Sequence, residues 1–210
     1  MEEIVWKNQH IILHHYKAIF WKEEKALLIA DAHLGKVSHF RKAGMAIPDA
    51  AAYRNLERME ELLQQFNPEK VIFLGDLFHS EMNLEWMAFK NLLRQHNRAF
   101  ILIEGNHDIL HQSSYEKSGM QVVAELNVGP FNFTHDPQPH PTLYNLSGHI
   151  HPGVLMSGLG KQSVRLPCFY FGKENGILPA FGEFTGLAML KPVKNDKIYL
   201  VVNQKIIRAA

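Results

Sequence analysis

Three short apolar runs, each followed at once by polar residues, constrain the fold of this chain more than any other feature. The runs cover residues 26–30, 71–74 and 100–103. Runs of this length that are apolar throughout and bounded by glycine and polar residues are typical of strands buried on both faces. The polar residues that follow them are, in order, Asp31-Ala32-His33, Gly75-Asp76 and Glu104-Gly105-Asn106-His107-Asp108.

Two helical patterns separate these runs. Residues 50–66 carry apolar side chains at helical spacing, with Asp49 as a candidate N-cap and Asn67-Pro68 as the end, and residues 84–95 show a second such pattern. Alternating strands and helices predict a parallel sheet with crossover helices. Because parallel strands align their carboxyl ends, we expect the polar clusters to meet along one sheet edge, where open α/β sheets bind ligands.

The second half of the chain has a different pattern. It contains short strand-like segments separated by Gly, Pro and Asn, and no further helical crossover of comparable strength. We therefore predict a second sheet packed on the first, within a single α/β domain of residues 1–210. A chain of 210 residues, 46% of them hydrophobic, suffices for one such core. The segments cover residues 121–126, 131–134, 143–147, 164–171, 186–190 and 198–203.

Five clusters along the chain collect residues that bind metal ions. Carboxylate, imidazole and amide ligands together suit Mn, Fe or Zn better than Ca or Mg. A single Asp-x-His pair arises easily by chance. Three clusters at the ends of consecutive parallel strands, followed by two more, are far less easily assembled by accident. In order they are Asp31-Ala32-His33, Gly75-Asp76-Leu77-Phe78-His79, Gly105-Asn106-His107-Asp108, Thr134-His135 and Gly148-His149-Ile150-His151.

The order of these clusters resembles that of the calcineurin-like metallophosphoesterase superfamily. The resemblance implies a four-layer αββα sandwich, with two mixed sheets flanked by helices. It also implies two divalent metal ions, which we expect to be Mn, with Fe or Zn as alternatives. One ion would be held by Asp31, His33, Asp76 and His151, and the other by Asp76, Asn106, His135 and His149, so that Asp76 bridges the pair. The His135 cluster departs from the family pattern, because Thr134 precedes His135 where glycine is usual. A second histidine, His140, lies nearby in the sequence.

The chemistry of such a pair fits phosphate ester hydrolysis. Two cations about 3.5–4 Å apart repel each other, so a shared carboxylate is needed between them. Metal coordination lowers the pKa of bound water and so supplies a hydroxide nucleophile near neutral pH. By resemblance, His107 protonates or stabilises the leaving oxygen, and Asp108 could orient the His107 ring.

A narrower resemblance covers nearly the whole chain. The motifs that carry it are residues 31–36, 40–44, 148–152, 165–169 and 178–186, together with Pro48. The matching subfamily is the bacterial ligase-associated DNA damage response endonuclease, which implies a DNA substrate. It also implies a functional link to an ATP-dependent DNA ligase, an exonuclease and a helicase.

Several residues are candidates for contacts with the substrate. Lys36, His39, Arg41 and Lys42 follow the first cluster and could bind a phosphate backbone, although the same residues are also typical of the solvated face of a short helix. His79 could contact the substrate or support a ligand. The full predicted set of substrate contacts is Asn106, His107, Arg41, His79 and Arg165.

Composition limits the remaining possibilities. Lys and Arg total 22 against 21 for Asp and Glu, so the net charge of +1 gives no global argument for binding nucleic acid or membrane. Cys168 is the single cysteine, which excludes an internal disulfide. The chain shows neither a secretion signal nor an apolar run of about 20 residues, so we expect a cytoplasmic protein. Two alternatives stay open, namely a small-molecule phosphoesterase acting on nucleotides or phosphomonoesters, and a non-catalytic scaffold.

Overall fold

A computed structural model describes residues 1–37, 50–158, 160, 162–183 and 185–209. In this part of the chain, one sheet has seven strands in the order β1 to β7. Strands β1 to β4 are antiparallel neighbours, whereas β4 to β7 are parallel. The strands are β1 (Glu2–Trp6), β2 (Gln9–Leu13), β3 (Ala18–Trp21), β4 (Ala26–Ile29), β5 (Lys70–Phe73), β6 (Ala99–Ile103) and β7 (Met120–Val123).

The second sheet has nine strands within the described residues, in the order β14-β11-β12-β13-β10-β9-β8, with β15 paired to β12 and β16 paired to β15. Parallel pairs of β10 with β9 and β13 stand beside antiparallel pairs, so this sheet is mixed as well. The strands are β8 (Leu126–Val128), β9 (Phe131–Phe133), β10 (Tyr144–Ser147), β11 (Pro152–Ser157), β12 (Ser163–Phe171), β13 (Asn175–Ile177), β14 (Ala188–Met189), β15 (Lys197–Val202) and β16 (Lys205–Arg208).

The predicted crossover helices are confirmed with their boundaries. Helix α2 (Ala50–Phe66) joins β4 to β5, and α3 (Leu84–Gln95) joins β5 to β6. Asn83 caps α3, since its side chain accepts a hydrogen bond from the backbone N–H of Trp86 at 3.0 Å. A short helix, α4 (Gln112–Glu116), precedes β7.

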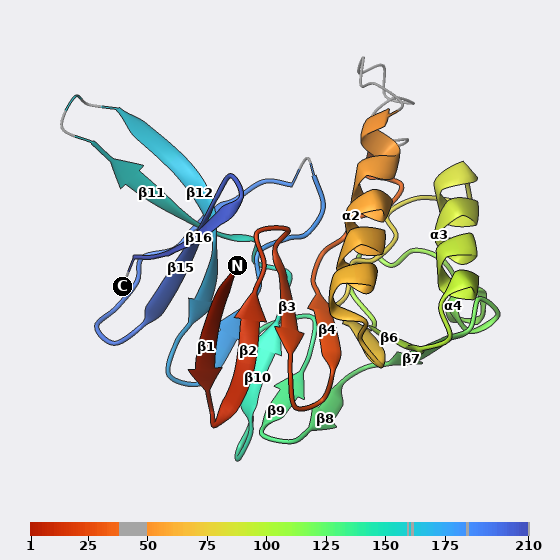
Figure 1. The fold of residues 1–210 in the computed structure, drawn as a ribbon, viewed down its shortest axis with the longest axis horizontal. Helices are drawn as coiled ribbons and strands as arrows, with labels where there is room; N and C mark the ends of the chain where they lie inside the picture. Colours follow the sequence, from red (N-terminus) through yellow and green to blue (C-terminus); the bar gives the residue numbers. More distant parts are fainter. Residues whose placement is uncertain (38–49, 159, 161, 184, 210) are drawn as a thin grey trace.

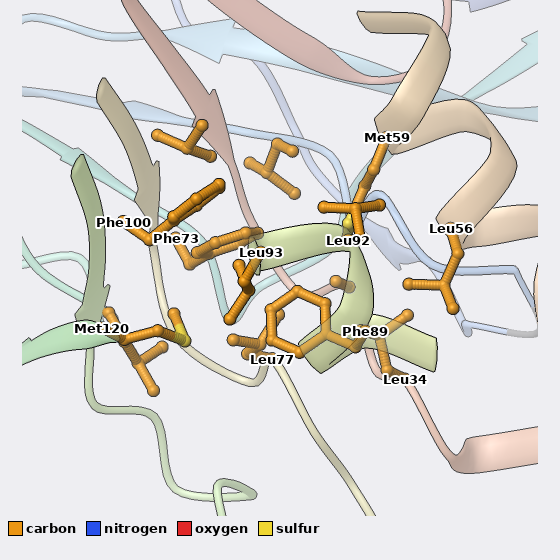
Figure 2. Close-up of a cluster of buried hydrophobic side chains, with 14 of the residues drawn as sticks. Leu34, Leu56, Met59, Phe73, Leu77, Phe89, Leu92, Leu93, Phe100 and Met120 are labelled. Atoms are coloured by element: carbon orange, nitrogen blue, oxygen red, sulfur yellow. The ribbon is translucent and has the colours of Figure 1, made fainter. Parts of the chain in front are cut away.

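Apolar packing divides the described molecule into layers. One core cluster lies between the helices and the first sheet and includes Phe73, Phe89 and Met120 (Figure 2). A second cluster lies between the two sheets, where Leu28 and Ile72 are buried together with Phe133. Each central strand of the first sheet contributes to both clusters, which explains why runs such as residues 71–74 are apolar throughout.

The α/β class and the two mixed sheets are therefore confirmed, with two differences from expectation. The described helices α2, α3 and α4 all lie on the first sheet (Figure 1), so no described helix covers the outer face of the second sheet. The sequence contains no strong helical pattern in that half. In addition, residues 121–123 of the predicted segment 121–126 belong to the first sheet, because β7 pairs with β6 in parallel, and only Leu126 enters the second sheet, as the first residue of β8.

None of the helices described here is both long and apolar enough to cross a membrane.

Cys168 is fully buried in β12, beside Ile198 and Leu200. Burial raises the pKa of its thiol to about 12, so the thiolate is scarce at neutral pH. We expect the native protein to react with Ellman's reagent at least about a hundredfold more slowly than the guanidinium-unfolded protein. A fast reaction of the native chain, measured by absorbance, would show that this strand opens readily.

Candidate metal centre

The predicted clusters meet at the carboxyl ends of β4, β5 and β6. Backbone hydrogen bonds fix the first two loops side by side: the N–H of Asp31 donates to the carbonyl of Gly75 at 3.2 Å, and the N–H of His33 donates to that of Asp76 at 2.9 Å. The third loop joins them, since the N–H of His107 donates to Asp76 Oδ1 at 2.8 Å. The polar edge predicted from parallel strands therefore exists.

The second sheet brings its own residues to the same edge. His135 follows β9, and His149 follows β10, which runs parallel to β9. The backbone N–H of His149 donates to both carboxylate oxygens of Asp31, at 3.1 and 2.9 Å. This contact links the two sheets directly at the candidate site.

One group of possible metal ligands consists of Asp31, His33 and His151. The Nε2 atoms of His33 and His151 face each other at 3.3 Å, and His151 Nε2 lies 3.6 Å from Asp31 Oδ1. Asp76 Oδ2 lies 3.9 Å from His33 Nε2, so this carboxylate borders the group. Burial, reinforced by the charges of Lys36 and His151, lowers the pKa of His33 to about 2. The ring of His33 is therefore neutral, which is the form that binds a metal.

The other group consists of Asp76, His135 and His149. His135 Nε2 lies 3.4 Å from Asp76 Oδ1, 3.1 Å from His149 Nδ1 and 2.9 Å from the side-chain oxygen of Asn106. Asp76 thus offers one oxygen to each group, as expected for a bridging carboxylate. His140 stays apart, because its Nδ1 accepts a hydrogen bond from the N–H of Leu143 at 3.0 Å.

The chemistry of these atoms fits metal ions. His135 Nδ1 donates to the carbonyl of Leu74 at 2.9 Å, so the Nε2 atom of a neutral ring carries a lone pair. This lone pair points at other electron-rich atoms, an arrangement that a cation between them stabilises. Ligands about 2.0–2.2 Å from one ion lie about 3–3.4 Å apart, close to the observed separations within both groups.

The backbone at the candidate ligands is strained. Positive φ angles occur at Asp31 (51°), His33 (46°), Asp76 (50°), His149 (64°) and His151 (52°). Such conformations are costly for residues with a side chain and persist where the surroundings enforce them, often at functional sites. Here they turn five of the seven predicted ligands toward one volume.

Glycines next to the ligands allow the loops to approach closely. A Cβ atom on Gly75 would overlap the imidazole of His135, and one on Gly105 would overlap the backbone nitrogen and carboxylate of Asp76. A Cβ atom on Gly148 would lie 2.6 Å from Asp31 Oδ2. The glycine before Asp76, Asn106 and His149 is therefore required by the packing of ligand against ligand.

Asp136 is a site residue that the sequence analysis missed. Its Oδ1 atom lies 3.4 Å from His149 Nε2, on the side of the ring opposite the Nδ1 atom that faces His135. A carboxylate in this position favours the tautomer with the proton on Nε2 and leaves Nδ1 available to a metal. Its position directly after His135 in the sequence could have indicated that it lies at the site.

We expect Asp136→Asn to weaken binding of the more weakly held Mn²⁺ ion by about tenfold. Because Asp136 is 67% exposed, the effect lies at the lower end for such orienting residues. Glu174→Gln is a matched control, since that carboxylate is 64% exposed and lies outside the site. Calorimetric titration with Mn²⁺ measures both variants, and equal affinities would contradict the role given to Asp136.

Asp108 takes a different role from the predicted one. Its Oδ1 atom accepts hydrogen bonds from the N–H groups of Leu77 and Phe78 and from the hydroxyl of Tyr115, at 2.8, 3.1 and 3.2 Å. Its Oδ2 atom accepts from the N–H of Gly105 at 2.9 Å. The carboxylate therefore ties the second and third loops together, and none of its hydrogen bonds to described residues reaches the His107 ring. Burial raises the pKa of Asp108 against these hydrogen bonds.

The predicted substrate contacts do not all lie beside the ligand groups. His107 and Asn106 are exposed at the site, and the rings of His79 and His107 lie 4.5 Å apart between centroids. Lys36 lies near the cluster, since burial lowers its pKa while Asp76 and Asp31 raise it. Arg165 pairs with Leu155 out on the β11–β12 hairpin and joins the cluster through no described hydrogen bond. Arg41, His39 and Lys42 lie outside the described residues.

Comparison with known proteins agrees with this geometry. The sequence pattern of the calcineurin-like phosphoesterase family matches residues 24–178, which include all seven candidate ligands. The chain belongs to the calcineurin-like phosphoesterase family. As a member, it is a metal-dependent phosphoesterase, and its family implies two divalent metal ions, for which the two ligand groups provide candidate sites.

Solved structures related to this calcineurin-like phosphoesterase include a nuclease. The crystal structure of Pseudomonas putida nuclease MPE aligns with a TM-score of 0.81 and 32% identity over 99% of both chains. Yfce, a phosphoesterase from E. coli, aligns over 88% of this chain and 98% of its own, with a TM-score of 0.46 and 14% identity. No curated protein matches the sequence.

Proposed function

We propose that this phosphoesterase is a dinuclear, manganese-dependent phosphodiesterase that cuts DNA as an endonuclease in the bacterial DNA damage response. The observation that carries the proposal is the pair of ligand groups that share Asp76. Similarity to the Pseudomonas putida nuclease over the full length of both chains supports nuclease activity. The subfamily motifs support the role in DNA repair, a cytoplasmic location and the functional link to a DNA ligase, an exonuclease and a helicase.

Two sets of residues would hold the two metal ions. Asp31, His33, Asp76 and His151 would hold one ion, and Asp76, Asn106, His135 and His149 the other. When bound, the ions would neutralise phosphoryl oxygens and lower the pKa of water.

His107 is exposed beside the cluster, and its backbone N–H is fixed on Asp76 at 2.8 Å. Its ring would donate a proton or a hydrogen bond to the leaving oxygen. His79, whose ring lies 4.5 Å from that of His107, would help to position the ring or the substrate.

The exposure of the site supports a polymeric substrate. Asn106 and His107 are exposed, and the side chain of His149 is 36% exposed, so the reacting phosphate can belong to a long strand. The small-molecule alternative uses the same ligand groups, since metal ions recognise phosphoryl oxygens and not the rest of the substrate. The non-catalytic alternative is disfavoured because Asp76, Asn106 and His107 are all present.

The test is incubation of the purified protein with covalently closed circular DNA and Mn²⁺, with Mg²⁺, Zn²⁺ and EDTA in parallel reactions. The proposal predicts nicked and linear products with Mn²⁺ and none with EDTA. The diester bis-p-nitrophenyl phosphate should be hydrolysed faster than the monoester p-nitrophenyl phosphate. Intact DNA alongside rapid turnover of the monoester would instead establish the small-molecule alternative.

A further inference from the structure

A cavity of about 440 Å³ lies at the end of the molecule opposite the metal centre. It is formed by Trp6 at the end of β1, by Gly172 and Lys173 after β12, and by the loop at residues 193–196. Strand β1 runs antiparallel to β2, β2 to β3 and β3 to β4, so β1 ends at the edge where β4 begins. Asp31 follows the other end of β4, and the cavity is therefore separate from the metal site.

Positive charge is concentrated around this cavity. Lys7, Lys173 and Lys194 line it, and Lys197 follows in the chain directly after the lining loop. The nearby carboxylates are fewer. Asp196 is buried and accepts the N–H of Val193 at 2.8 Å, so it is occupied in holding the loop, and Glu174 lies 4.0 Å from the largely exposed Lys173. In a chain with a net charge of only +1, this local excess of cations favours an anionic ligand.

Aromatic rings hold two of these lysines in place. The Nζ atom of Lys197 lies 4.9 Å from the centroid of the Trp6 ring, and that of Lys7 lies 4.9 Å from the Tyr144 ring. Trp6 packs edge-on to Tyr144 at 5.4 Å between centroids. Because cation–π contacts order the ammonium groups before any ligand arrives, less conformational entropy is lost on binding.

The lining combines an apolar floor with a cationic rim. Trp6, Val193 and Gly172 contribute apolar surface, and Val193 is 69% exposed although it is a large hydrophobic residue. An inorganic anion alone would leave this apolar surface in water. A ligand that carries both a flat ring and a phosphate would cover the floor and also meet the lysines.

We infer that this cavity is a second binding site, which takes a nucleotide through its phosphate and its base. The ligand can be a free nucleotide or the phosphorylated end of a strand, because both present the same chemistry. Lys7 and Lys194 bind the phosphate, and the base covers the apolar floor beside Trp6. The site does no chemistry of its own and lies apart from the metal ligands.

Tryptophan fluorescence gives a local readout of binding. Trp21 and Trp86 are each 1% exposed, so a ligand-induced change in emission reports on Trp6, the remaining tryptophan. The metal-loaded protein is titrated with AMP, adenosine, inorganic phosphate and a 5′-phosphorylated oligonucleotide. Trp6→Phe identifies the signal that comes from Trp6.

We expect AMP to change the emission with a Kd below about 1 mM, and adenosine and phosphate to bind at least about tenfold more weakly. Lys7→Ala combined with Lys194→Ala should lower the affinity for AMP by at least about tenfold. Lys205→Ala, which removes an exposed lysine on β16, should leave that affinity unchanged. Turnover of bis-p-nitrophenyl phosphate should stay unchanged in Trp6→Phe, in the double lysine variant and in Lys205→Ala. Saturation by the oligonucleotide at lower concentration than AMP would identify a strand end as the source, and the reverse order would identify a free nucleotide.

Two results would overturn the inference. One is an emission unchanged by AMP and by the oligonucleotide up to about 10 mM. The other is equal affinity of the wild type and the double lysine variant. Neither result bears on the metal centre, whose activity is followed separately with the small diester.

Discussion

We expect Asp76→Asn to lower the turnover of bis-p-nitrophenyl phosphate by at least about a thousandfold. Asp76 is 2% exposed and lies 3.9 Å from His33 through Oδ2 and 3.4 Å from His135 through Oδ1, so it serves both ligand groups. Asparagine keeps the shape but removes the negative charge that offsets two cations. The measured metal content should fall below two ions per chain.

Asp196→Asn is the matched control for this change. Asp196 is also buried, at 8% exposure, and its carboxylate caps the N–H of Val193 far from the metal edge. This variant should keep its metal content and its turnover. If Asp76→Asn retained more than about a tenth of wild-type activity with two ions bound, Asp76 would not be the bridging ligand.

We expect Gly75→Ala to disable the metal centre without any change to a ligand. Gly75 has φ +81°, and a Cβ atom there would overlap the His135 imidazole. The left-handed conformation costs about 1 kcal/mol for alanine, and the overlap adds about 1–3 kcal/mol or displaces His135. A displacement of about 1 Å is enough to lower activity by about a hundredfold.

Gly119→Ala separates the cost of the left-handed backbone from the cost of the overlap. Gly119 has φ +96°, but no atom lies within 4 Å of its Cβ position, so this variant carries only the conformational cost. It should lose about 1 kcal/mol in the free energy of unfolding and keep its activity. Chemical denaturation and diester turnover are measured on both variants. Equal losses of activity would contradict the close packing of ligand against ligand.

Pattern alone predicted the centre of the first sheet. The apolar runs at residues 26–30, 71–74 and 100–103 became β4, β5 and β6 because strands buried on both faces leave a continuous signal. The helices at 50–66 and 84–95 were equally visible, since one face of each packs on the sheet.

Other elements left no comparable signal. Strands β1 and β2 are partly exposed and mix polar with apolar residues, and β3 is apolar but has only four residues. Strands β11, β13 and β16 are short or face water, so none of these six strands was predicted. Residues 121–123 of the segment at 121–126 were assigned to the wrong sheet, since they belong to β7, whereas Leu126 lies in β8 as expected. The sequence does not state which neighbour a short strand pairs with. The extent of the domain, residues 1–210, stays a prediction.

The candidate site was predictable where its residues follow strands. Asp31, Asp76 and Asn106 come together because parallel strands end at one edge, and the order of strands and helices in the sequence is enough to predict this. The orienting role of Asp136, the carbonyl of Leu74 against His135 and the left-handed backbone of five ligands depend on contacts between distant loops. For the same reason Asp108 was given a role at the His107 ring, whereas its carboxylate holds backbone N–H groups.

Anomalous diffraction from crystals loaded with Mn²⁺ tests most directly whether two metal ions share Asp76. Two anomalous peaks about 3.5–4 Å apart are expected. One should lie among Asp31, His33 and His151, the other among Asn106, His135 and His149, with one Asp76 oxygen on each. A single peak at full Mn²⁺ loading, or two peaks with Asp76 bound to only one of the two ions, would contradict the sharing of Asp76.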